Sequence, residues 1–584
     1  MAGAMPPLQV DFLPAKPNEL RVRFPYDARL VDLIRTVPGR RYDPDTKTWR
    51  IPSQTLRALQ TEAARWGITI QLDNAVLQAQ EVGQRNKDEL RALKDVEDVA
   101  LDLPTETKVR NYQRVGIRFM WRALRGFKGV LLADDPGLGK TLQALSIVAM
   151  NANLQKVLVL CPASIKYVWE GEIQKHYPQL SYVVIDGLPE RRAELWGSDA
   201  RIKIANYELL NQRHERDCLR SNSEKRKADP KAPCTCGKVL RPDAALRTTE
   251  WDLVIADECT RLKSYKAQTP RIAKELERRY SIGLSGTPIE NHLEELHSIM
   301  DFAVPGLLGP GWLFVQQHCV YRNGIHVGYK AVDVVREKIA PHYIRRRKAD
   351  VLQELPPKVY NDVLLELSPA EWRIYTAIRE QIVTMVGENP KLSVGNILTE
   401  MLRLKQCVND VRLLGEDGIP SSKVSALWDT LEASEGHSLV VFTQFAEWAQ
   451  ILQKEFGGFL LYGAVSTDKR RDMIEAFQAG KETLLFSTEA GAYGITLTAA
   501  DIVIHLDQPW NPARLIQRED RLHRIGQKSS VNVVNFIARR TIDEYVRKIL
   551  HRKAALAKLV FQDEVEEAMQ ITKADLLSLL GAGE

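Results

Sequence analysis

A glycine-rich turn at residues 134–141 has the composition of a phosphate-binding loop. It follows the apolar run at 130–132 and reads Asp-Asp-Pro-Gly-Leu-Gly-Lys-Thr. In such a turn, backbone N–H groups and the N-terminus of the next helix bind phosphate. Lys140 would reach the β and γ phosphates of a nucleotide, and the Thr141 hydroxyl would bind Mg²⁺. The strict pattern has glycine at position 134, so a chance glycine turn is the alternative. We expect nucleotide contacts from Asp135, Gly137, Leu138, Gly139, Lys140 and Thr141.

A pair of carboxylates, Asp257 and Glu258, follows the apolar strand expected at 252–256. A carboxylate at the end of such a strand is well placed to bind Mg²⁺, and the next one to orient a water molecule. We assign Asp257 to the metal and Glu258 to the attacking water. Alone, an Asp-Glu pair is usually a solvated turn; the phosphate-loop pattern upstream favours the catalytic interpretation.

Two arginines, Arg521 and Arg524, lie three positions apart in the segment 517–527. This spacing predicts that both lie on one face of a helix. Two guanidinium groups there could stabilise charge on a transferred phosphoryl group as arginine fingers. Gln517, at the start of the segment, is a further candidate nucleotide ligand. The alternative is an exposed basic helix, since His523 and Lys528 lie nearby.

Length and composition predict an ordinary globular protein with about three or four domains over 584 residues. The 81 basic and 75 acidic residues leave a net charge of +6, which is compatible with nucleic-acid contact but does not establish it. Seven sparse cysteines suggest a reducing compartment. We expect neither a signal peptide at residues 1–12 nor a membrane span. A soluble protein of the cytoplasm or nucleus follows as the expected class.

Short apolar runs alternate with helical patterns, which predicts an α/β fold with two parallel-sheet lobes, helical insertions and a small N-terminal α/β domain. The expected strands lie at 130–132, 156–160, 252–255 and 280–284 in one lobe, and at 438–442, 483–486 and 502–506 in the other. Residues 369–404 are expected to be mostly helical. The expected divisions are an accessory domain at 1–75, a charged linker at 76–107, a first lobe at 108–340 and a second lobe at 341–584.

Taken together, the motifs from about Arg110 to Arg547 resemble the Swi/Snf class of superfamily 2 helicase-like ATPases, which translocate on double-stranded DNA. The matching motifs are Arg110-Asn111-Tyr112-Gln113, the phosphate loop, Cys161-Pro162-Ala163-Ser164, Asp257-Glu258, Ser285-Gly286-Thr287-Pro288, Ile344 to Lys348, Ser487 to Gly491, and Asp507 to Gln527. The resemblance implies two RecA-like lobes and a DNA-dependent ATPase that uses ATP and Mg²⁺, with Gln113 contacting adenine. The chain departs from the family at Thr260, where the family usually has histidine, and at Asn111, Ala492 and Thr496.

The resemblance also implies a track for the DNA backbone over both lobes. Hydroxyls, amides and basic side chains can hold phosphates without reading the base sequence. The candidate contacts are Ser164, Lys166, Ser285, Thr287, Thr443, Gln444, Thr488 and Trp510. Each of them singly could instead be a cap or turn residue, and the basic run at 345–348 could be a solvated face.

The N-terminal residues resemble the HepA-related (HARP) domain of annealing helicases. The matching residues are Phe24, Tyr26-Asp27, Leu30, Tyr42-Asp43, Lys47 and Trp49. This resemblance implies recognition of branched DNA and an annealing activity in DNA repair. The alternative is a small accessory domain in which Tyr42 and Trp49 only pack the core.

Two further questions stay open at the level of sequence. His214, Cys218, Cys234 and Cys236 could bind zinc, although the Cys-x-Cys spacing is atypical and a reduced loop is the alternative. For function, the alternatives to an annealing translocase are a motor that displaces proteins from DNA and a nucleotide-gated DNA-binding scaffold. We expect a monomer, and the sequence does not indicate protein partners.

Overall fold

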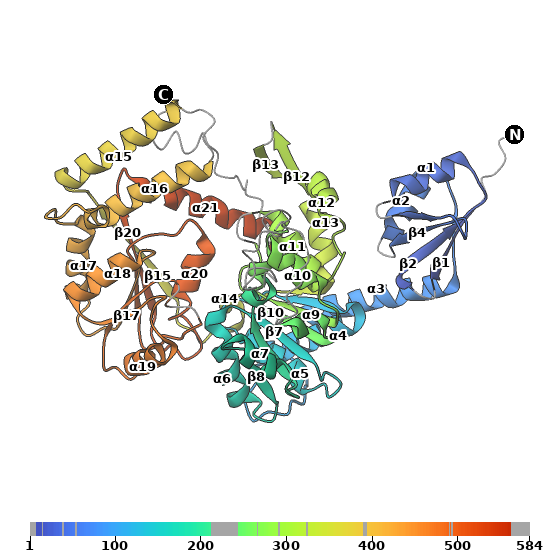
Figure 1. Cartoon of the computed structure of the whole chain (residues 1–584), viewed down its shortest axis with the longest axis horizontal. Helices are drawn as coiled ribbons and strands as arrows, with labels where there is room; N and C mark the ends of the chain where they lie inside the picture. The colour runs from blue at the N-terminus through green and yellow to red at the C-terminus, as the bar shows by residue number, and fades with distance from the viewer. Residues whose placement is uncertain are drawn as a thin grey trace, which may run out of the picture.

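The computed structural model describes residues 7–13, 16–37, 40–52, 55–211, 243–265, 267–289, 292–322, 325–388, 394–489, 491 and 494–561. It contains a small N-terminal unit and two larger α/β lobes (Figure 1). The five strands of the N-terminal unit form a sheet in the order β3-β4-β2-β1-β5, and the two lobes contain sheets of seven and six strands. Figure 1 places the N-terminal unit away from both lobes, at the far end of helix α3.

The N-terminal unit is a small α/β unit, as its sequence predicts. Its strands are β1 (Leu8–Leu13), β2 (Lys16–Arg23), β3 (Arg41–Asp43), β4 (Thr48–Pro52) and β5 (Ile70–Leu72), and its helices are α1 (Ala28–Thr36) and α2 (Leu56–Arg65). The Asp27 side chain accepts a hydrogen bond from the Arg29 N–H and thereby caps α1. Apolar residues of both helices pack on the sheet to form a separate core.

Helix α3 (Asn74–Lys94) occupies much of the segment expected to be a charged linker. Its Leu90 is fully buried in the core of the first lobe, and its Lys94 ammonium lies 5.5 Å from the Phe119 ring centroid. Glu89 also forms an ion pair with Arg122 of the first lobe. These contacts make α3 a packed strut rather than a loose tether, a property that charge composition alone did not indicate.

The first lobe is a parallel sheet covered by helices on both faces. Its strand order is β14-β6-β11-β10-β7-β9-β8. These strands are β6 (Gly129–Leu132), β7 (Val157–Cys161), β8 (Tyr182–Val184), β9 (Ile202–Asn206), β10 (Trp251–Asp257), β11 (Arg278–Leu284) and β14 (Tyr343–Ile344). Every residue of β6 and β7 is buried, as expected for strands packed on both sides. Two apolar clusters, one on each face, form the core.

The helices of this lobe begin with α4 (Asn111–Phe127), α5 (Lys140–Ala149), α6 (Lys166–His176) and α7 (Pro189–Trp196). They continue with α9 (Ala244–Thr248), α10 (Gln268–Glu275), α11 (Leu293–Ala303), α12 (Gly311–His318), α13 (Val332–Ile339) and α14 (Lys348–Val351), and a hairpin joins β12 (Cys319–Arg322) to β13 (Ile325–Tyr329). The division expected between residues 340 and 341 precedes the last strand of this sheet, because β14 pairs with β6.

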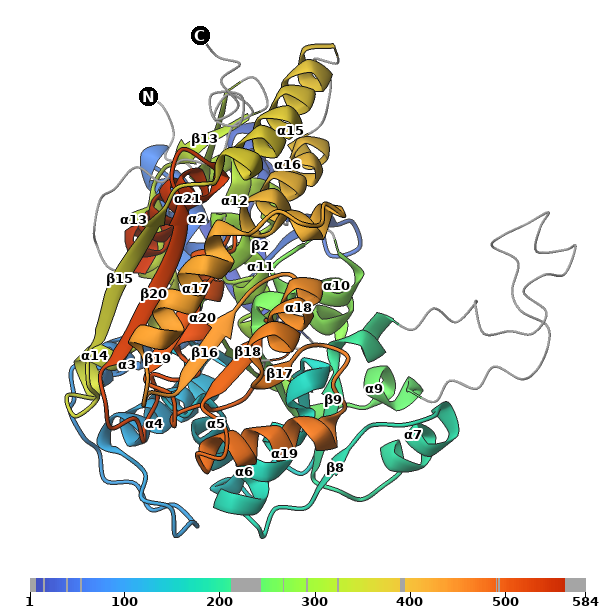
Figure 2. The same ribbon diagram turned by 90° about the vertical axis from the view of Figure 1, so that its left-hand side faces the viewer.

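The second lobe repeats the parallel arrangement in the order β15-β20-β19-β16-β18-β17. Its strands are β15 (Lys358–Leu365), β16 (Leu439–Phe442), β17 (Phe459–Leu461), β18 (Leu484–Ser487), β19 (Ile502–His505) and β20 (Val531–Ala538). Its helices are α15 (Pro369–Glu388), α16 (Val394–Asn409), α17 (Ser422–Ala433), α18 (Ala446–Phe456), α19 (Thr467–Gln478), α20 (Pro512–Glu519) and α21 (Ile542–Phe561). Figure 2 shows α15 and α16 extending beyond the sheet at the top.

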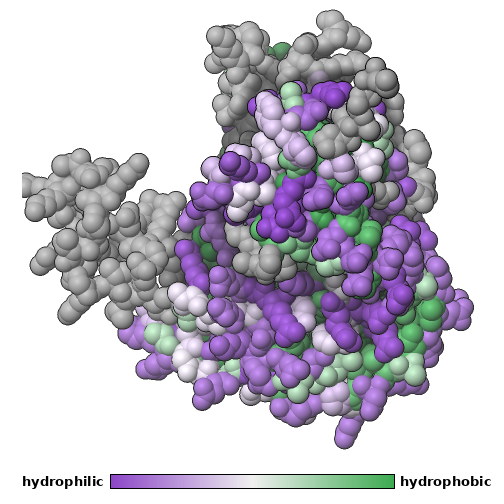
Figure 3. Space-filling view, turned by 90° about the vertical axis from the view of Figure 1, so that its right-hand side faces the viewer, coloured by the Kyte–Doolittle hydropathy of each residue, from purple (hydrophilic) through white to green (hydrophobic). Residues whose placement is uncertain are grey.

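The surface seen in Figure 3 is mainly hydrophilic, with hydrophobic side chains scattered in small groups. Among the residues that the structure describes, no helix combines the length and apolarity needed to cross a bilayer.

Candidate nucleotide site

The phosphate loop lies between β6 and α5, as the strand-turn-helix pattern predicts. Gly137 and Gly139 have φ values of +87° and +74°, a conformation that side chains other than glycine rarely adopt. The Lys140 ammonium donates hydrogen bonds to the carbonyl oxygens of Asp134 and Asp135, at 2.7 and 3.3 Å. The lysine is therefore held over the loop, where it can reach a phosphate group.

Gln113 fixes the phosphate loop to the start of α4. Its Oε1 accepts a hydrogen bond from the Arg110 N–H at 3.0 Å, and its Nε2 donates to the Leu138 carbonyl at 3.2 Å. The side chain is buried. A cavity of about 1220 Å³ adjoins this end of α4 and is lined in part by Arg110, Tyr112 and Arg345. The structure places Gln113 beside the phosphate loop, and its expected contact with adenine stays a prediction.

Asp134, which stands where the strict loop pattern has glycine, has a structural partner far along the chain. Its completely buried carboxylate accepts hydrogen bonds from the backbone N–H and Nε of Arg346, at 3.1 and 2.9 Å, and from Gln143 Nε2 at 3.1 Å. Arg346 also lies over the Tyr112 ring, 5.3 Å from its centroid. The alternative of a solvated basic run is therefore wrong for Arg346, which anchors the phosphate loop to β14.

Replacing Arg346 with alanine is expected to destabilise the fold by about 3–5 kcal/mol, because it leaves the buried Asp134 carboxylate without its charged partner. Arg347→Ala is the matched control, since Arg347 pairs with Asp350 at the surface and such pairs contribute about 0–1 kcal/mol. Urea unfolding of both variants measures the difference. Equal losses in the two variants would contradict the anchoring role of Arg346.

Asp257 lies at the C-terminal end of β10, with both carboxylate oxygens held by hydrogen bonds. Oδ2 accepts from the Trp169 indole Nε1 at 2.8 Å, and Oδ1 accepts from the Glu258 N–H at 2.8 Å. Burial raises the pKa of Asp257, while the Trp169 hydrogen bond and the charge of Lys140 oppose that rise. Trp169 was not among the residues predicted for the site, because its position on α6 carries no catalytic signal in the sequence.

The residues expected to bind Mg²⁺ have suitable chemistry. Thr141 supplies a hydroxyl at the start of α5, and Asp257 supplies a carboxylate whose charge is felt by Lys140. Mg²⁺ is usually held by one or two such protein oxygens, with phosphate oxygens and water completing its shell. Glu258 follows in a left-handed backbone conformation, with φ of +47°. The donor set therefore fits a magnesium-nucleotide complex.

Arg521 and Arg524 do not share a helix face, because α20 ends at Glu519. The buried Asp520 carboxylate binds the ammonium groups of Lys348 and Lys358, at 2.7 and 3.0 Å, and the chain turns there. Both arginines are thus carried by a turn, and the helical expectation is wrong in this detail.

The turn nevertheless brings Arg524 directly against the phosphate loop. A Cβ atom added to Gly137 would lie 3.1 Å from Arg524 Cγ. Burial and the neighbouring charge of Arg521 lower the pKa of Arg524 to about 9, so it is charged at neutral pH. Arg524 Nη1 also donates to the Thr496 hydroxyl at 3.0 Å. The two halves of the predicted site, far apart in sequence, therefore meet.

Lys348 joins the phosphate loop to the arginine turn. Its backbone N–H donates to the Asp135 carboxylate at 3.0 Å, while its ammonium group contacts Asp520 and donates to the His523 carbonyl at 2.5 Å. Burial lowers the pKa of Lys348 to about 8, against the opposing effect of Asp520. This residue was expected only as part of a basic segment, and the structure shows that it links the two lobes.

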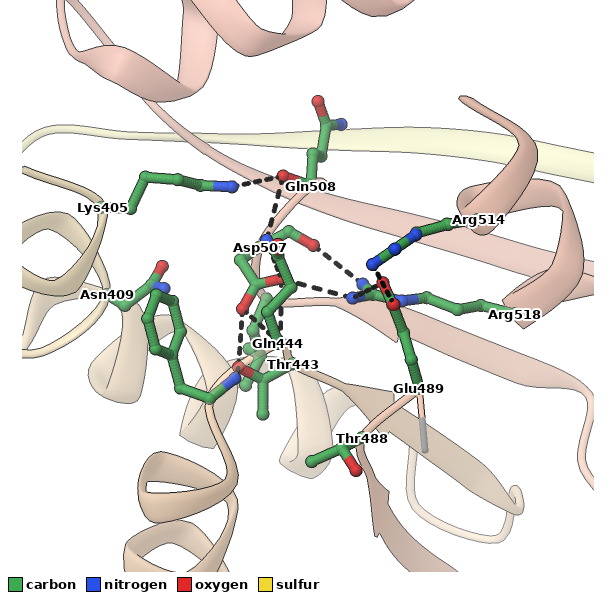
Figure 4. Close-up of polar contacts among 12 residues, drawn as sticks. Lys405, Asn409, Thr443, Gln444, Thr488, Glu489, Asp507, Gln508, Arg514 and Arg518 are labelled. Atoms are coloured by element: carbon green, nitrogen blue, oxygen red, sulfur yellow. Dashed lines mark hydrogen bonds and ion pairs between the residues drawn. The ribbon is translucent and has the colours of Figure 1, made fainter. Parts of the chain in front are cut away.

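A buried polar network supports α20, which precedes the arginine turn (Figure 4). Arg518 donates to the Asp507 carbonyl at 3.0 Å and lies 3.3 Å from the Glu489 carboxylate. The Asp507 side chain accepts from Thr443 Oγ1 at 2.6 Å and from Gln444 Nε2 at 3.0 Å. Thr443 is completely buried. Thr443 and Gln444 therefore hold Asp507 in place, and their expected contact with DNA stays a prediction.

The other residues expected to touch DNA differ in their exposure. Ser164 is exposed, whereas Lys166 is buried and pairs with Asp186 at 3.1 Å. Ser285 is buried and accepts from the Thr287 N–H at 3.0 Å, and Thr488 is buried and accepts from the Gly491 N–H at 3.3 Å.

Thr287 and Trp510 are half-buried. Trp510 packs on the helical core of the second lobe, with the Lys405 ammonium 5.4 Å from its ring centroid. In this conformation the exposed member of the set of eight is Ser164, so the set as a whole does not form an exposed track.

The remaining predicted residues are the candidate nucleotide ligand Gln517 and the four possible zinc ligands. Gln517 is half-buried on α20. The possible zinc ligands His214, Cys218, Cys234 and Cys236 lie outside the described residues. Within the described part of the chain, no group of three or more His, Cys, Asp or Glu side chains is arranged to hold a metal ion.

Comparison with protein families supports the interpretation of the motifs. Residues 112–413 match the SNF2-related domain, residues 422–526 the helicase conserved C-terminal domain, and residues 20–74 the HepA-related protein (HARP) domain. The chain is 31% identical over 501 residues to an uncharacterized ATP-dependent helicase of Mycoplasma pneumoniae, covering 83% of this chain and 45% of that protein.

Two further similarities extend the comparison. The chain is 27% identical over 572 residues to the TATA-binding protein-associated factor mot1 of Aspergillus fumigatus, covering 84% of this chain and 29% of that protein. Among solved structures, the Sulfolobus solfataricus SWI2/SNF2 ATPase core in complex with dsDNA is 28% identical, with a TM-score of 0.38 over 81% of this chain and 100% of that one. The chain spans about half the length or less of the curated relatives named here.

The SNF2-related match alone covers more than half of the chain, and the helicase C-terminal match follows it in the second lobe. The resemblance drawn from the motifs, including the HARP segment, is thereby confirmed. The chain belongs to the SNF2-related protein family.

Proposed function

We propose that this protein is an ATP-driven translocase on double-stranded DNA. The observation that carries the proposal is the contact of Arg524 with Gly137, because it assembles one nucleotide site from two lobes. A site divided in this way couples the nucleotide to the relative position of the lobes, which is what a motor requires. The proposed divisions are the N-terminal unit at 1–75, the strut and connecting segment at 76–107, and the two lobes beyond it.

In the proposed reaction, the residues of both lobes act on ATP. Lys140 and the loop N–H groups bind the phosphates, Thr141 and Asp257 hold Mg²⁺, and Glu258 orients the attacking water. Mg²⁺ supplies neutralisation of the charge that develops on the phosphate oxygens. Arg521 and Arg524 stabilise the same charge from the second lobe. We place the base and ribose in the cavity beside Arg110 and Tyr112, close to Gln113.

We infer further that the DNA acted on is branched. The supporting observations are the HARP match at residues 20–74 and two exposed aromatic side chains in that unit. Tyr26 is 90% exposed and Tyr42 is 52% exposed, although Tyr42 also packs against Trp49 with ring centroids 5.1 Å apart. Unpaired bases at a fork can stack on such rings. Reannealing of the separated strands would then follow from movement toward the branch.

The full chain should hydrolyse ATP faster with duplex DNA than without DNA, and fastest with a fork. Replacing Tyr26 and Tyr42 by alanine should raise the fork concentration for half-maximal stimulation by roughly tenfold, through lost stacking, and leave duplex stimulation unchanged. A coupled ATPase assay on single-stranded, duplex and forked DNA measures this. Trp312→Ala, at an exposed aromatic residue of α12, is the control. Equal stimulation by all three DNAs, unaffected by these substitutions, would rule out fork recognition.

The second candidate function is displacement of proteins from DNA. It is favoured by the similarity to a protein named a TATA-binding protein-associated factor. Removal of a bound protein block without rewinding of an unpaired bubble would support this alternative. A nucleotide-gated scaffold has less support, because Glu258 and both arginines would then have no use.

A further inference from the structure

Helix α6 (Lys166–His176) lies next to a candidate DNA contact and interacts with three other residues around the site. Ser164, exposed just before the helix, is one of the candidate DNA contacts of this lobe. Val168 packs against Gly494 of the second lobe, since a Cβ atom on Gly494 would lie 3.3 Å from Val168 Cγ2. Trp169 binds Asp257, and the charge of Glu172 acts on Arg524. One rigid helix thus connects the DNA side, the other lobe and the metal carboxylate.

Burial and hydrogen bonds fix the contact between Trp169 and Asp257. The Trp169 side chain is completely buried in the apolar core of the first lobe, so its indole has little freedom to turn. Its Nε1 donates to Asp257 Oδ2 at 2.8 Å, and the Tyr207 hydroxyl donates to the Asp257 backbone carbonyl at 2.7 Å. An indole N–H can only donate, so it favours the ionised carboxylate that a metal requires.

Such partners control how well a carboxylate binds a metal. A hydrogen bond to one oxygen orients the other lone pairs, and loss of such a partner typically weakens metal binding by about 10–100-fold. Trp169 lies one helical turn after Ile165, so a rigid-body shift of α6 would move the indole relative to Asp257. Ile165 also lies at the contact with the second lobe, 2.6 Å from a Cβ atom built on Gly494.

We propose that Trp169 is a positioning residue for the Asp257 carboxylate and that it transmits DNA contact and lobe contact at α6 to the magnesium site. The inference rests on the proposed ATPase function. Trp169 does not touch the reacting atoms; it acts through Asp257. Contact of α6 with DNA or with the second lobe would therefore change the affinity of the site for Mg²⁺. ATP hydrolysis would be stimulated when α6 is held in these contacts.

The chain offers a matched control. Trp196 is another buried tryptophan of the same lobe, and its Nε1 donates to the Asp243 carboxylate at 2.7 Å. Trp169→Phe and Trp196→Phe each remove one indole-carboxylate hydrogen bond while keeping an aromatic ring in the core. Only the first of these bonds lies at the proposed metal site, so general effects of the substitution appear in both variants.

The decisive measurement is Mn²⁺ binding to the ADP-loaded full chain, followed by electron paramagnetic resonance. Trp169→Phe should weaken Mn²⁺ binding by about 10–100-fold, and Trp196→Phe should leave it unchanged. The ratio of DNA-stimulated to unstimulated ATP hydrolysis should fall in Trp169→Phe alone. Equal effects in the two variants, or wild-type Mn²⁺ binding in Trp169→Phe, would overturn the inference.

A second readout keeps the inference testable if Trp169→Phe does not fold. In wild-type protein labelled with ¹⁵N at its indole groups, adding Mg²⁺ to the ADP-loaded chain should shift one slowly exchanging indole resonance. A Trp169→His variant lacks the indole, so the resonance that it loses is that of Trp169. Because histidine keeps a ring N–H, this variant should bind Mn²⁺ more tightly than Trp169→Phe. An unshifted indole spectrum would contradict the proposal. Absence of ATP hydrolysis by the wild-type chain would instead reject the proposed function, so the two failures are distinguishable.

Discussion

Replacing Arg524 with alanine is expected to lower the turnover of ATP by about 10³-fold or more. Arg524 lies against Gly137 of the phosphate loop and is held there by Thr496. Its charge would face the γ-phosphate as negative charge develops during transfer, which is where a preorganised cation contributes most. Steady-state ATP hydrolysis on saturating duplex DNA measures the loss. Nucleotide binding should change much less than turnover, since the effect belongs to the transition state.

Arg514→Ala provides the control for this experiment. Arg514 lies on α20, a few residues before the arginine turn, and its exposed side chain pairs with Glu489 at 2.6 Å. Its loss removes one positive charge from the same region without touching the phosphate loop. A similar fall in turnover in both variants would indicate a general charge effect. Normal turnover in Arg524→Ala would show that the contact of the two lobes has no catalytic role.

The second large effect is expected from Glu258→Gln, which should reduce turnover by about 10²–10⁴-fold while ATP still binds. Glutamine keeps the shape of the side chain but cannot accept a proton from the attacking water. The backbone N–H of Glu258 donates a hydrogen bond to Asp257 Oδ1. The isosteric change from glutamate to glutamine leaves this backbone hydrogen bond in place. ATP binding by equilibrium titration and hydrolysis by single-turnover kinetics separate the two steps.

Lys140→Ala should behave differently from Glu258→Gln. Lys140 contacts the phosphate loop directly, so its loss should weaken ATP binding as well as hydrolysis. Glu250→Gln, at an exposed carboxylate before β10, should leave both unchanged. ATP hydrolysis by Glu258→Gln at the wild-type rate would remove this residue from the mechanism. A wild-type chain no more active than Lys140→Ala on any DNA would favour the scaffold alternative.

Local patterns predicted those parts of the site that depend only on neighbouring residues. The phosphate loop is a strand, a glycine turn and a helix start in immediate succession. Asp257 is the last residue of strand β10. Their backbone geometry is set within a few residues, so sequence alone was sufficient. The parallel strands were predicted for a similar reason, because a run of consecutive apolar residues requires burial on both faces.

Contacts between distant segments could not be predicted in this way. Asp134 departs from the loop pattern because its carboxylate pairs with Arg346, which is 212 positions away. The spacing of Arg521 and Arg524 predicted a helix, but α20 ends at Glu519. The next residue, Asp520, binds the ammonium groups of Lys348 and Lys358. In each case the partner that decides the conformation comes from another element.

The sequence also did not predict the direction in which polar side chains at strand ends point. Thr443 and Lys166 have the polarity of surface ligands, yet Thr443 is bonded to Asp507 inside the second lobe, and the buried Lys166 donates to the Ile185 carbonyl and pairs with the partly exposed Asp186. The charged composition of α3 predicted a linker, but the buried Leu90, together with contacts of Lys94 and Glu89, docks the helix on the first lobe. Polarity indicates that a side chain needs a partner, and it does not say whether the partner is internal or a ligand.

The sequence by itself determined the family and the two-lobed α/β class, because these follow from local motifs and apolar runs. It also located the candidate nucleotide-binding residues, whose contacts with a nucleotide stay a prediction. The tertiary structure decided how the halves of the site meet. Arg524 reaches Gly137, Lys348 joins Asp135 to Asp520, and Trp169 holds Asp257. These contacts join residues far apart in the chain, and folding brings them together only through the packing of the lobes.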